Sequence, residues 1–116
     1  MSERTDSDFA RDIEEAIKRI SAYSAGLTYE TFLLDTKTQD AIVRNLEIIG
    51  EAAKKISDQV RAQHATIPWK SMAGVRDRLI HDYFGVSFDV VWEIITNDLP
   101  QVVDPLKRLL DEEASE

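Results

Sequence analysis

Apolar residues recur with a helical spacing over most of the chain. The first run alternates steps of four and three residues, at Phe9, Ile13, Ala16, Ile20 and Tyr23. This spacing places one apolar stripe along one face of an amphipathic helix. Ser7 or Asp8 is suited to cap the start of the helix, and Gly26 lies just beyond its end. We therefore predict a first helix over residues 8–25.

The second run is longer and predicts the central helix. The same spacing recurs at Ile42, Leu46, Ile49, Ala53, Ile56 and Val60. It is typical of a seam packed at a shallow angle, and it predicts a helix over residues 36–62, after a short turn or helical lead-in over residues 28–34. Gly50 lies inside this helix, where glycine costs roughly 1 kcal/mol relative to alanine. Together with Ala52 and Ala53, it predicts a close approach by another helix backbone.

The remaining apolar positions predict three further helices. Thr66 can cap a third helix that begins near Pro68 and ends at Gly85. Ser87 can start a fourth helix, and Asn97 or Asp98 can cap a fifth. The inward positions of these helices are Trp69, Met72, either Val75 or Arg76, Leu79, Phe88, Val91, Trp92, Ile95, Leu99, Val103, Leu106 and Leu110. No strand pattern of comparable length and no internal repeat is present, so we predict an all-α, antiparallel bundle of four to five helices.

Length and composition fit one soluble domain over residues 1–116. The chain has no cysteine, which excludes disulfides and cysteine-held zinc. Its polar first residues resemble no targeting signal, so we expect a cytoplasmic protein. The formal net charge of −8 argues against general affinity for nucleic acid. Four of the carboxylates lie in residues 111–116, which we interpret as a flexible, solubilising tail.

Two histidines are the candidates for acid–base catalysis by imidazole, His64 and His81. His64 lies in a polar linker without a charged partner at helical spacing, and we interpret it as a solvated loop residue. His81 lies in the dense polar segment RDRLIHDY, residues 76–83. On a continuous helix, Asp77 and Arg78 would both be able to contact its imidazole.

Arg76 and His81 would not converge easily on one phosphate from a single straight helix. They are five positions apart, which is about 140° around an ideal helix. Either the helix is distorted near His81, or a second copy of the chain completes the site across a twofold axis. An ordinary structural role is equally open at this point, since arginine, histidine and tyrosine near a helix end often cap carbonyls or cover the edge of a core.

The chain resembles the HepT branch of the HEPN superfamily, whose members are small helical toxin ribonucleases. The resemblance covers nearly the whole chain, through FLLDTKTQDAIVRNLEIIGEAAKKI, IPWKSMAGVRDRLIHDYFGV and VWEIITNDLP. The family motif is an arginine, four to six residues, and a histidine. Here it consists of Arg76, four residues and His81, followed by Asp82 and Tyr83.

This resemblance implies RNA cleavage without a metal or another cofactor, by a homodimer whose two motifs face each other. His81 would act as general base or acid on the ribose 2′-hydroxyl or the leaving oxygen. Arg76 would hold the scissile phosphate, and Asp77 would orient the histidine. Arg44, Lys54, Lys55 and Arg78 are further candidates for phosphate contacts, although each is also an ordinary solvated helix residue.

The resemblance also implies a regulatory partner. HepT-like toxins are paired with a small nucleotidyltransferase antitoxin, MntA, which transfers AMP from ATP to the motif tyrosine, here Tyr83. The added negative charge and bulk would compete with RNA for Arg76 and switch the toxin off. The alternative is that the bundle is a non-catalytic binding partner of such a nucleotidyltransferase.

Overall fold

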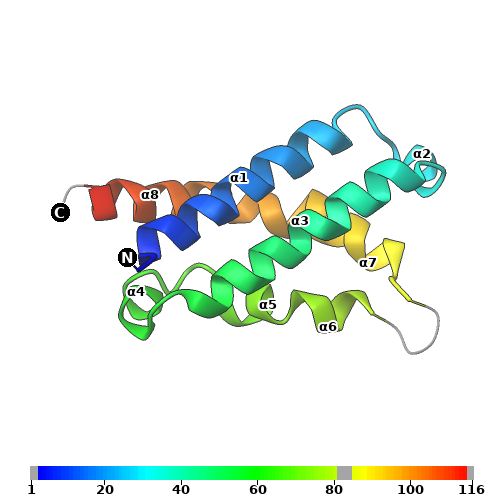
Figure 1. Ribbon diagram of the computed structural model, residues 1–116. Coiled ribbons are helices and arrows are strands. Elements are labelled where there is room, and N and C mark those ends of the chain that lie inside the picture. The colour runs from blue at the N-terminus through cyan, green and yellow to red at the C-terminus, as the bar shows by residue number, and fades with distance from the viewer. Residues whose placement is uncertain (1–2, 81–84, 115–116) are drawn as a thin grey trace.

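The helices form an all-α bundle, as the sequence predicts (Figure 1). The computed structural model describes residues 3–80 and 85–114. Within these ranges the helices are α1 (Asp6–Ser24), α2 (Tyr29–Leu33), α3 (Thr36–Lys55), α4 (Asp58–Gln63), α5 (Trp69–Ala73), α6 (Val75–Leu79), α7 (Phe88–Glu93), a π-helical segment η2 (Ile94–Asp98), a 3-10 segment η3 (Leu99–Gln101) and α8 (Val103–Ala114). The regular elements of these ranges are all helical, and none is long and apolar enough to cross a membrane.

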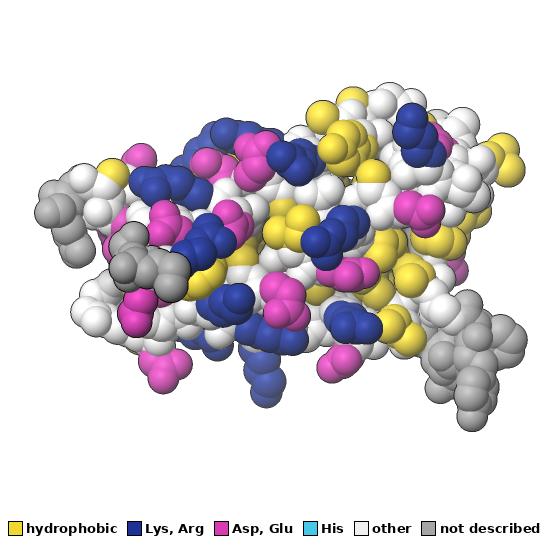
Figure 2. Space-filling model, in the orientation of Figure 1, with side chains coloured by type: hydrophobic (Ala, Val, Ile, Leu, Met, Phe, Trp, Pro, Cys, Tyr) yellow, Lys and Arg dark blue, Asp and Glu magenta, His cyan; other side chains and the backbone are white. Residues whose placement is uncertain are grey.

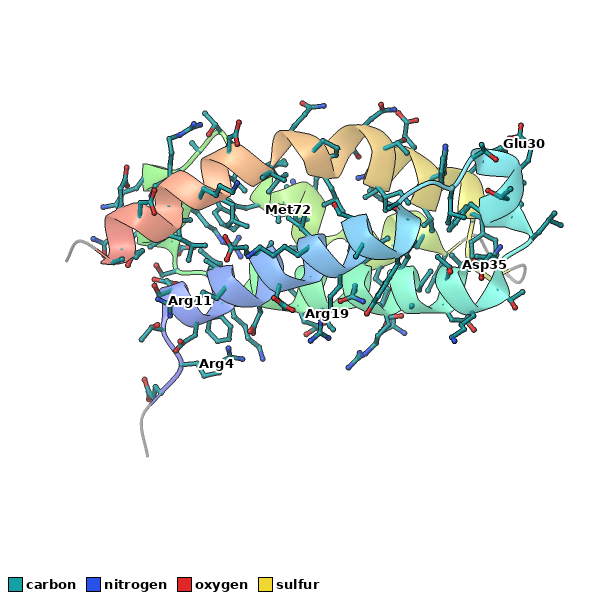
Figure 3. All side chains as sticks on the ribbon, turned by 90° about the horizontal axis from the view of Figure 1, so that it is seen from above. Arg4, Arg11, Arg19, Glu30, Asp35 and Met72 are labelled. Carbon is teal, nitrogen blue, oxygen red and sulfur yellow. The ribbon has the colours of Figure 1, made fainter. Side chains whose placement is uncertain are left out.

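The two long helices, α1 and α3, pack antiparallel along the length of the molecule (Figure 1). Their predicted stripes form the centre of the core. The buried members are Ile13, Ala16, Ile20, Ile42, Leu46, Ile49, Ala53, Ile56 and Val60. The ends of the first stripe are less covered, because Phe9 is half-buried and Tyr23 is 42% exposed. In Figure 3, Arg11 and Arg19 extend from α1 toward solvent, whereas Met72 lies in the middle of the bundle.

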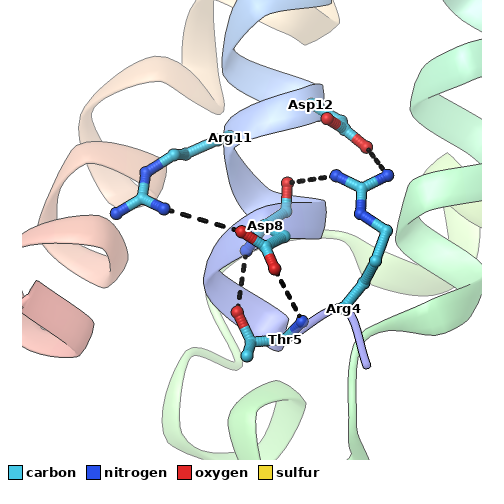
Figure 4. Close-up of polar contacts among 5 residues, drawn as sticks. All are labelled: Arg4, Thr5, Asp8, Arg11 and Asp12. Carbon is cyan, nitrogen blue, oxygen red and sulfur yellow. Dashed lines mark hydrogen bonds and ion pairs between the residues drawn. The ribbon is translucent and has the colours of Figure 1, made fainter. Parts of the chain in front are cut away.

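The N-terminus of α1 is held by a reciprocal cap (Figure 4). Thr5, rather than Ser7 or Asp8, is the N-cap residue: its side chain accepts from the backbone N–H of Asp8 at 3.2 Å, and its own N–H donates to Oδ2 of Asp8 at 2.9 Å. Arg4 pairs with Asp12 at 2.9 Å. This capping box provides partners for two backbone donors at the helix start.

The predicted central helix is interrupted after Lys55 by contacts from the N-terminus. Ser57 caps α4, and its backbone N–H and hydroxyl both donate to the Asp6 carboxylate at 2.7 Å. Arg61 donates to the carbonyls of Ala53 and Ile56, at 2.7 and 3.1 Å, near the C-terminus of α3. These side-chain partners replace the backbone bonds that a continuous helix would make. The expected helix over residues 36–62 is therefore two helices.

The predicted third helix is also divided and ends earlier than expected. Gly74 separates α5 from α6, and Ile80 has an extended backbone after α6 ends at Leu79. Pro68 is the N-cap residue of α5, so the predicted cap at Thr66 is wrong. Leu79 is buried, so the last residue of α6 is part of the core.

Where a break between the fourth and fifth helices is predicted, the chain stays helical and only the type of helix changes. From α7 the chain continues through η2 and η3 into α8, and the junction residues Ile94, Leu99 and Val102 all keep right-handed helical dihedrals. Leu106 is buried as predicted, whereas burial at the other two predicted positions is shifted by one residue: Val102 and Leu109 are buried, and Val103 and Leu110 are partly exposed. Helix α8 continues through residues 111–114, which belong to the predicted acidic tail.

Gly50 is the point where α3 meets α5 and α6, as the small patch predicts. A Cβ atom at this position would lie 3.1 Å from Cγ1 of Val75 and 3.3 Å from the carbonyl oxygen of Met72. Both neighbours belong to the core, and Met72 contributes backbone here. Glycine is therefore favoured here by the close approach of the helices and not by its own backbone dihedrals.

We expect Gly50→Val to lower the free energy of unfolding by roughly 1 to 3 kcal/mol, the usual cost of forcing extra carbons into a packed core. Glu51→Val is the matched control, because Glu51 is exposed on the same helix and the lower helix propensity of valine costs at most about 0.7 kcal/mol. Urea unfolding of both variants measures the difference. Equal destabilisation would contradict a packing role for Gly50.

The Asp8 carboxylate makes the stability of α1 depend on pH. The backbone N–H of Thr5 lowers the pKa of this carboxyl below its ordinary value of 3.8, and the Thr5 side chain, Arg4 and Arg11 act in the same direction. A lowered pKa in the folded state means that the ionised carboxylate stabilises the fold above pH 3.8. This contribution is lost as the pH falls below that value.

We therefore expect Asp8→Asn to be less stable than the wild type near neutral pH, and the difference to shrink below pH 3.8. Asp40→Asn is the control, since the Asp40 carboxylate is exposed on α3 and makes no hydrogen bond within residues 3–80 and 85–114. Thermal unfolding from pH 2 to 7 measures the effect. A difference between Asp8→Asn and the wild type that does not change with pH would contradict this assignment.

Candidate active site

Helix α6 presents the first half of the RDRLIHDY segment to solvent. Val75 and Leu79 are buried on the core side of this short helix, where it packs against α3. Arg76, Asp77 and Arg78 lie between these two anchors and are exposed. Two apolar residues one turn apart therefore fix the orientation of three charged ones.

The chain leaves α6 and returns to it within a few residues. Ile80 and Val86 form an isolated antiparallel bridge, and the backbone N–H of Ser87 donates to the carbonyl of Leu79 at 2.7 Å. Gly85 has a φ of 77°, a left-handed conformation that favours glycine. Gly85 therefore lies where the chain comes back to α6. It does not end the third helix, so that prediction is wrong. The described ends of the segment are held side by side.

The predicted catalytic His81, and Asp82 and Tyr83 after it, lie outside the described residues. The helix ends at Leu79, before His81, so the expected helical spacing from Asp77 and Arg78 to His81 does not apply. The predicted 140° separation between Arg76 and His81 assumes one straight helix. Because α6 ends at Leu79, that angle no longer applies. Of the two alternatives left open by the sequence, an interruption of the helix near His81 is observed.

The charged residues of α6 differ in their partners. Arg78 donates to Oδ2 of Asp98 on η2 at 3.2 Å, and both side chains are partly exposed. Within the part of the chain that the structure describes, Arg76 and Asp77 make no side-chain hydrogen bond or ion pair. The described residues therefore leave the donors of the Arg76 guanidinium unused, and a planar guanidinium is suited to a bidentate contact with a phosphate.

The interpretation of His64 as a solvated loop residue is wrong. Its side chain is 9% exposed, and Nε2 lies 3.0 Å from Oε2 of Glu112 on α8, although the pair lacks hydrogen-bond geometry. The carbonyl of His64 accepts from the indole N–H of Trp69 at 3.1 Å. Glu112 lies 48 positions away in the chain, so local sequence does not reveal this neighbour.

The other predicted phosphate contacts lie on α3 among acidic and aromatic neighbours. Lys54 pairs with Glu51 at 3.4 Å, and Lys55 lies over the ring of Phe9 at 5.7 Å. Arg44 lines a shallow groove between α1 and α3, together with Glu51. Basic and acidic side chains are intermixed over this face (Figure 2). Among residues 3–80 and 85–114, no group of three or more histidine or acidic side chains is placed to hold a metal ion.

Sequence reasoning missed one feature of this region, a cleft of about 430 Å³ beside α6. Its walls come from α3, α5, α6, η2 and η3, including Val75 and Arg78 of the motif helix. The volume falls within the range of about 300 to 1,000 Å³ that is usual for small-molecule sites. Because the lining residues are far apart along the chain, no local motif could have indicated the cleft.

Known proteins similar to this chain are ribonucleases by name. A family model described as "Ribonuclease HepT-like" matches residues 13–109. A protein of Thermococcus cleftensis named "Probable ribonuclease HepT" is 43% identical, over 91% of this chain and 96% of its own length. Proteins named as candidate RNases in Caldanaerobacter subterraneus and Methanocaldococcus jannaschii are 40% and 38% identical, over 89% and 88% of this chain and 88% and 84% of their own lengths. No solved structure shows a significant match. The family model covers most of the chain, and the chain therefore belongs to the HepT-like ribonuclease family.

Proposed function

We propose that this protein is a cytoplasmic toxin that cleaves RNA internally, without a metal ion, as a homodimer. In this proposal it is the toxin of a type VII toxin–antitoxin pair of the HepT and MntA kind. Its antitoxin is a small nucleotidyltransferase that neutralises it by transferring AMP to Tyr83. The observation that carries the proposal is the exposed Arg76 guanidinium, free of partners among the described residues and held on a helix anchored at both ends.

Arg76 and His81 divide the chemistry between them. His81 accepts the proton of a ribose 2′-hydroxyl, and the 2′-oxygen attacks the adjacent phosphorus. The bond from phosphorus to the 5′-oxygen breaks, and this oxygen leaves with a proton from an imidazolium. Arg76 stabilises the charge that develops on the phosphoryl oxygens, as a planar fork of donors is suited to do. Asp77, exposed beside Arg76, is the orienting partner in this proposal.

The dimer in this proposal rests on the family resemblance. The early end of α6 means that one chain is no longer prevented by helix geometry from bringing Arg76 and His81 together. A second copy would instead supply a second imidazole, so that one histidine accepts a proton while the other donates one. With one histidine neutral and the other protonated, removal of the 2′-hydroxyl proton and protonation of the leaving 5′-oxygen can both occur at one pH.

Tyr83 is the proposed point of control. It lies in the same short segment as His81, between the bridged residues Ile80 and Val86. Adenylylation of its hydroxyl would add a phosphodiester with one negative charge. That charge would compete with RNA for the exposed Arg76 guanidinium.

The alternative is a non-catalytic partner of a nucleotidyltransferase. The net charge of −8 and the mixed charges over the face of α1 and α3 favour it, because phosphate binding usually requires a basic surface. In this alternative Tyr83 is modified, but RNA remains intact in the presence of the purified protein.

We expect His81→Ala to lower the rate of RNA cleavage by about 10² to 10⁴, the usual contribution of a general acid or base. Arg76→Ala should lower it by about 10² to 10³, as for the loss of a donor that stabilises transition-state charge. Lys70→Ala is the control, an exposed cation on α5 outside the motif. Cleavage of a labelled RNA by each purified protein, and growth of cells expressing it, measure the effect. Cleavage by His81→Ala at the wild-type rate would rule out this mechanism.

We expect co-expression with a nucleotidyltransferase from a neighbouring reading frame to add AMP to the protein at Tyr83, as located by mass spectrometry of peptides. Tyr83→Phe should receive no AMP, so it should still cleave RNA in the presence of the transferase and ATP. Wild-type protein that is fully neutralised while every Tyr83 peptide stays unmodified would favour occlusion by the partner instead.

A further inference from the structure

The cleft beside α6 combines an apolar floor with polar groups at its rim. The floor includes Leu46, Ile49, Met72, Ile94 and Leu99. The polar residues that line it include Ser71, Arg78, Asp98 and Gln101. An apolar site with a few polar groups that fix orientation is the usual composition of a small-molecule pocket.

Two hydrogen-bond acceptors remain unused at this rim. Asp98 accepts from Arg78 through Oδ2, at 3.2 Å, and Oδ1 makes no hydrogen bond within the described ranges. Gln101 donates through Nε2 to the carbonyl of Asn97, at 2.9 Å, which leaves Oε1 as an acceptor. The two residues are three positions apart, on consecutive segments of one helical run. A ligand with two neighbouring N–H donors on one edge would match them.

The wall that carries Asp98 has an unusual backbone. Residues Ile94–Asp98 form a π-helical segment between the α-helical and 3-10 segments that flank it. Such segments are rare, and they occur frequently at functional sites. The change in winding is located where Ile94, Asp98 and Leu99 line the cleft.

The opposite wall is the motif helix itself. Val75 and Arg78 line the cleft and flank Arg76 and Asp77 on α6. A ligand in the cleft is therefore in contact with the same five-residue helix that carries Arg76. Arg76 itself does not line the cleft, and residues two positions apart on a helix project about 200° apart. A strand whose phosphate is held by Arg76 would therefore cross α6 to place a neighbouring base in the cleft.

We propose that this cleft binds a guanine base of the RNA next to the phosphate that is cleaved. The inference rests on the proposed ribonuclease function and adds its base preference. Guanine carries adjacent donors, the ring N1–H and the exocyclic amino group, that Asp98 and Gln101 accept. Single-stranded bases are commonly splayed out and read on this edge. Uracil presents carbonyl oxygens on either side of its one N–H, which a carboxylate repels.

This assignment also fits the acidic character of the chain. A base edge is neutral, so an acidic rim attracts its donors without repelling it, whereas the phosphate is left to Arg76. Within the described residues, Arg78 engages Oδ2 of Asp98, at 3.2 Å. Arg76 and the acceptors of Asp98 and Gln101 thus act on different parts of one nucleotide chain.

The first test fills the cleft without altering the motif. Ser71 is exposed on α5 and lines the cleft, so Ser71→Trp places an indole in it; Lys70→Trp, the adjacent exposed position that does not line the cleft, is the matched control. Sequencing of RNA fragments should show wild-type cleavage next to guanine at least about tenfold above other bases, a difference that corresponds to one good hydrogen-bonded contact. Ser71→Trp should lose this preference and Lys70→Trp should keep it. A wild type without base preference, or a Ser71→Trp variant with the wild-type preference, overturns the proposal.

The second test separates base recognition from helix positioning. Inosine lacks the exocyclic amino group of guanine. The wild type should cleave RNA faster next to guanosine than next to inosine. The Asp98→Ala variant should cleave next to both at the same rate. Arg78→Ala breaks the same ion pair but keeps the carboxylate, so it should retain the preference. If both variants lose the preference to the same extent, the pair only positions α6 and the proposal fails.

A third measurement distinguishes failure of this inference from failure of the proposed function. Guanosine monophosphate added to the wild type should shift the NMR signal of the Met72 methyl group at millimolar concentration, more than inosine or uridine monophosphate does. If RNA is not cleaved in a His81-dependent way but guanosine monophosphate binds selectively, the ribonuclease proposal fails and the cleft is a site for a free guanine nucleotide. Cleavage without any selective shift at Met72 overturns the guanine pocket and leaves the ribonuclease.

Discussion

The close packing of α5 and α6 against α3 at Gly50 determines where the motif segment lies. Because Gly50 has no side chain, Val75 and the backbone of Met72 lie directly against α3. Val75 is the first residue of α6, and with Leu79 it fixes which face of that helix is buried. The exposure of Arg76 is therefore a consequence of core packing one residue away.

The apolar pattern predicts the core well, because burial is repeated at many positions and tolerates local errors. Ile13, Ile42 and Leu46 are buried as predicted, and so are the inward positions of α5 and α6. The helix boundaries are predicted less well, because they depend on contacts between distant residues. The interruption at Ser57 requires the carboxylate of Asp6, which is 51 positions away in the chain. No local propensity contains that contact.

The candidate site shows the same division. The sequence identifies the motif residues by type and spacing, and the structure locates Arg76 and Asp77 on an exposed face. The structure places His64 next to Glu112 and Arg78 next to Asp98, partners that are distant in the sequence. The predictions about His64 and about the continuous motif helix were wrong for this reason: both assumed that local spacing alone decides a side chain's neighbours.

The end of α6 at Leu79 is the feature of the fold on which the proposed chemistry most depends. A helix continued to Gly85 would have spread Arg76 and His81 around its circumference at about 100° per residue. Instead, Ile80 is extended and pairs with Val86, while the N–H of Ser87 satisfies the carbonyl of Leu79. The positive φ of Gly85 permits this return at little cost. The two residues that bracket the segment are thereby held beside α6. Arg76 is located on that helix with its side chain exposed, and the described residues on either side of the His81 and Tyr83 segment are paired with each other next to it.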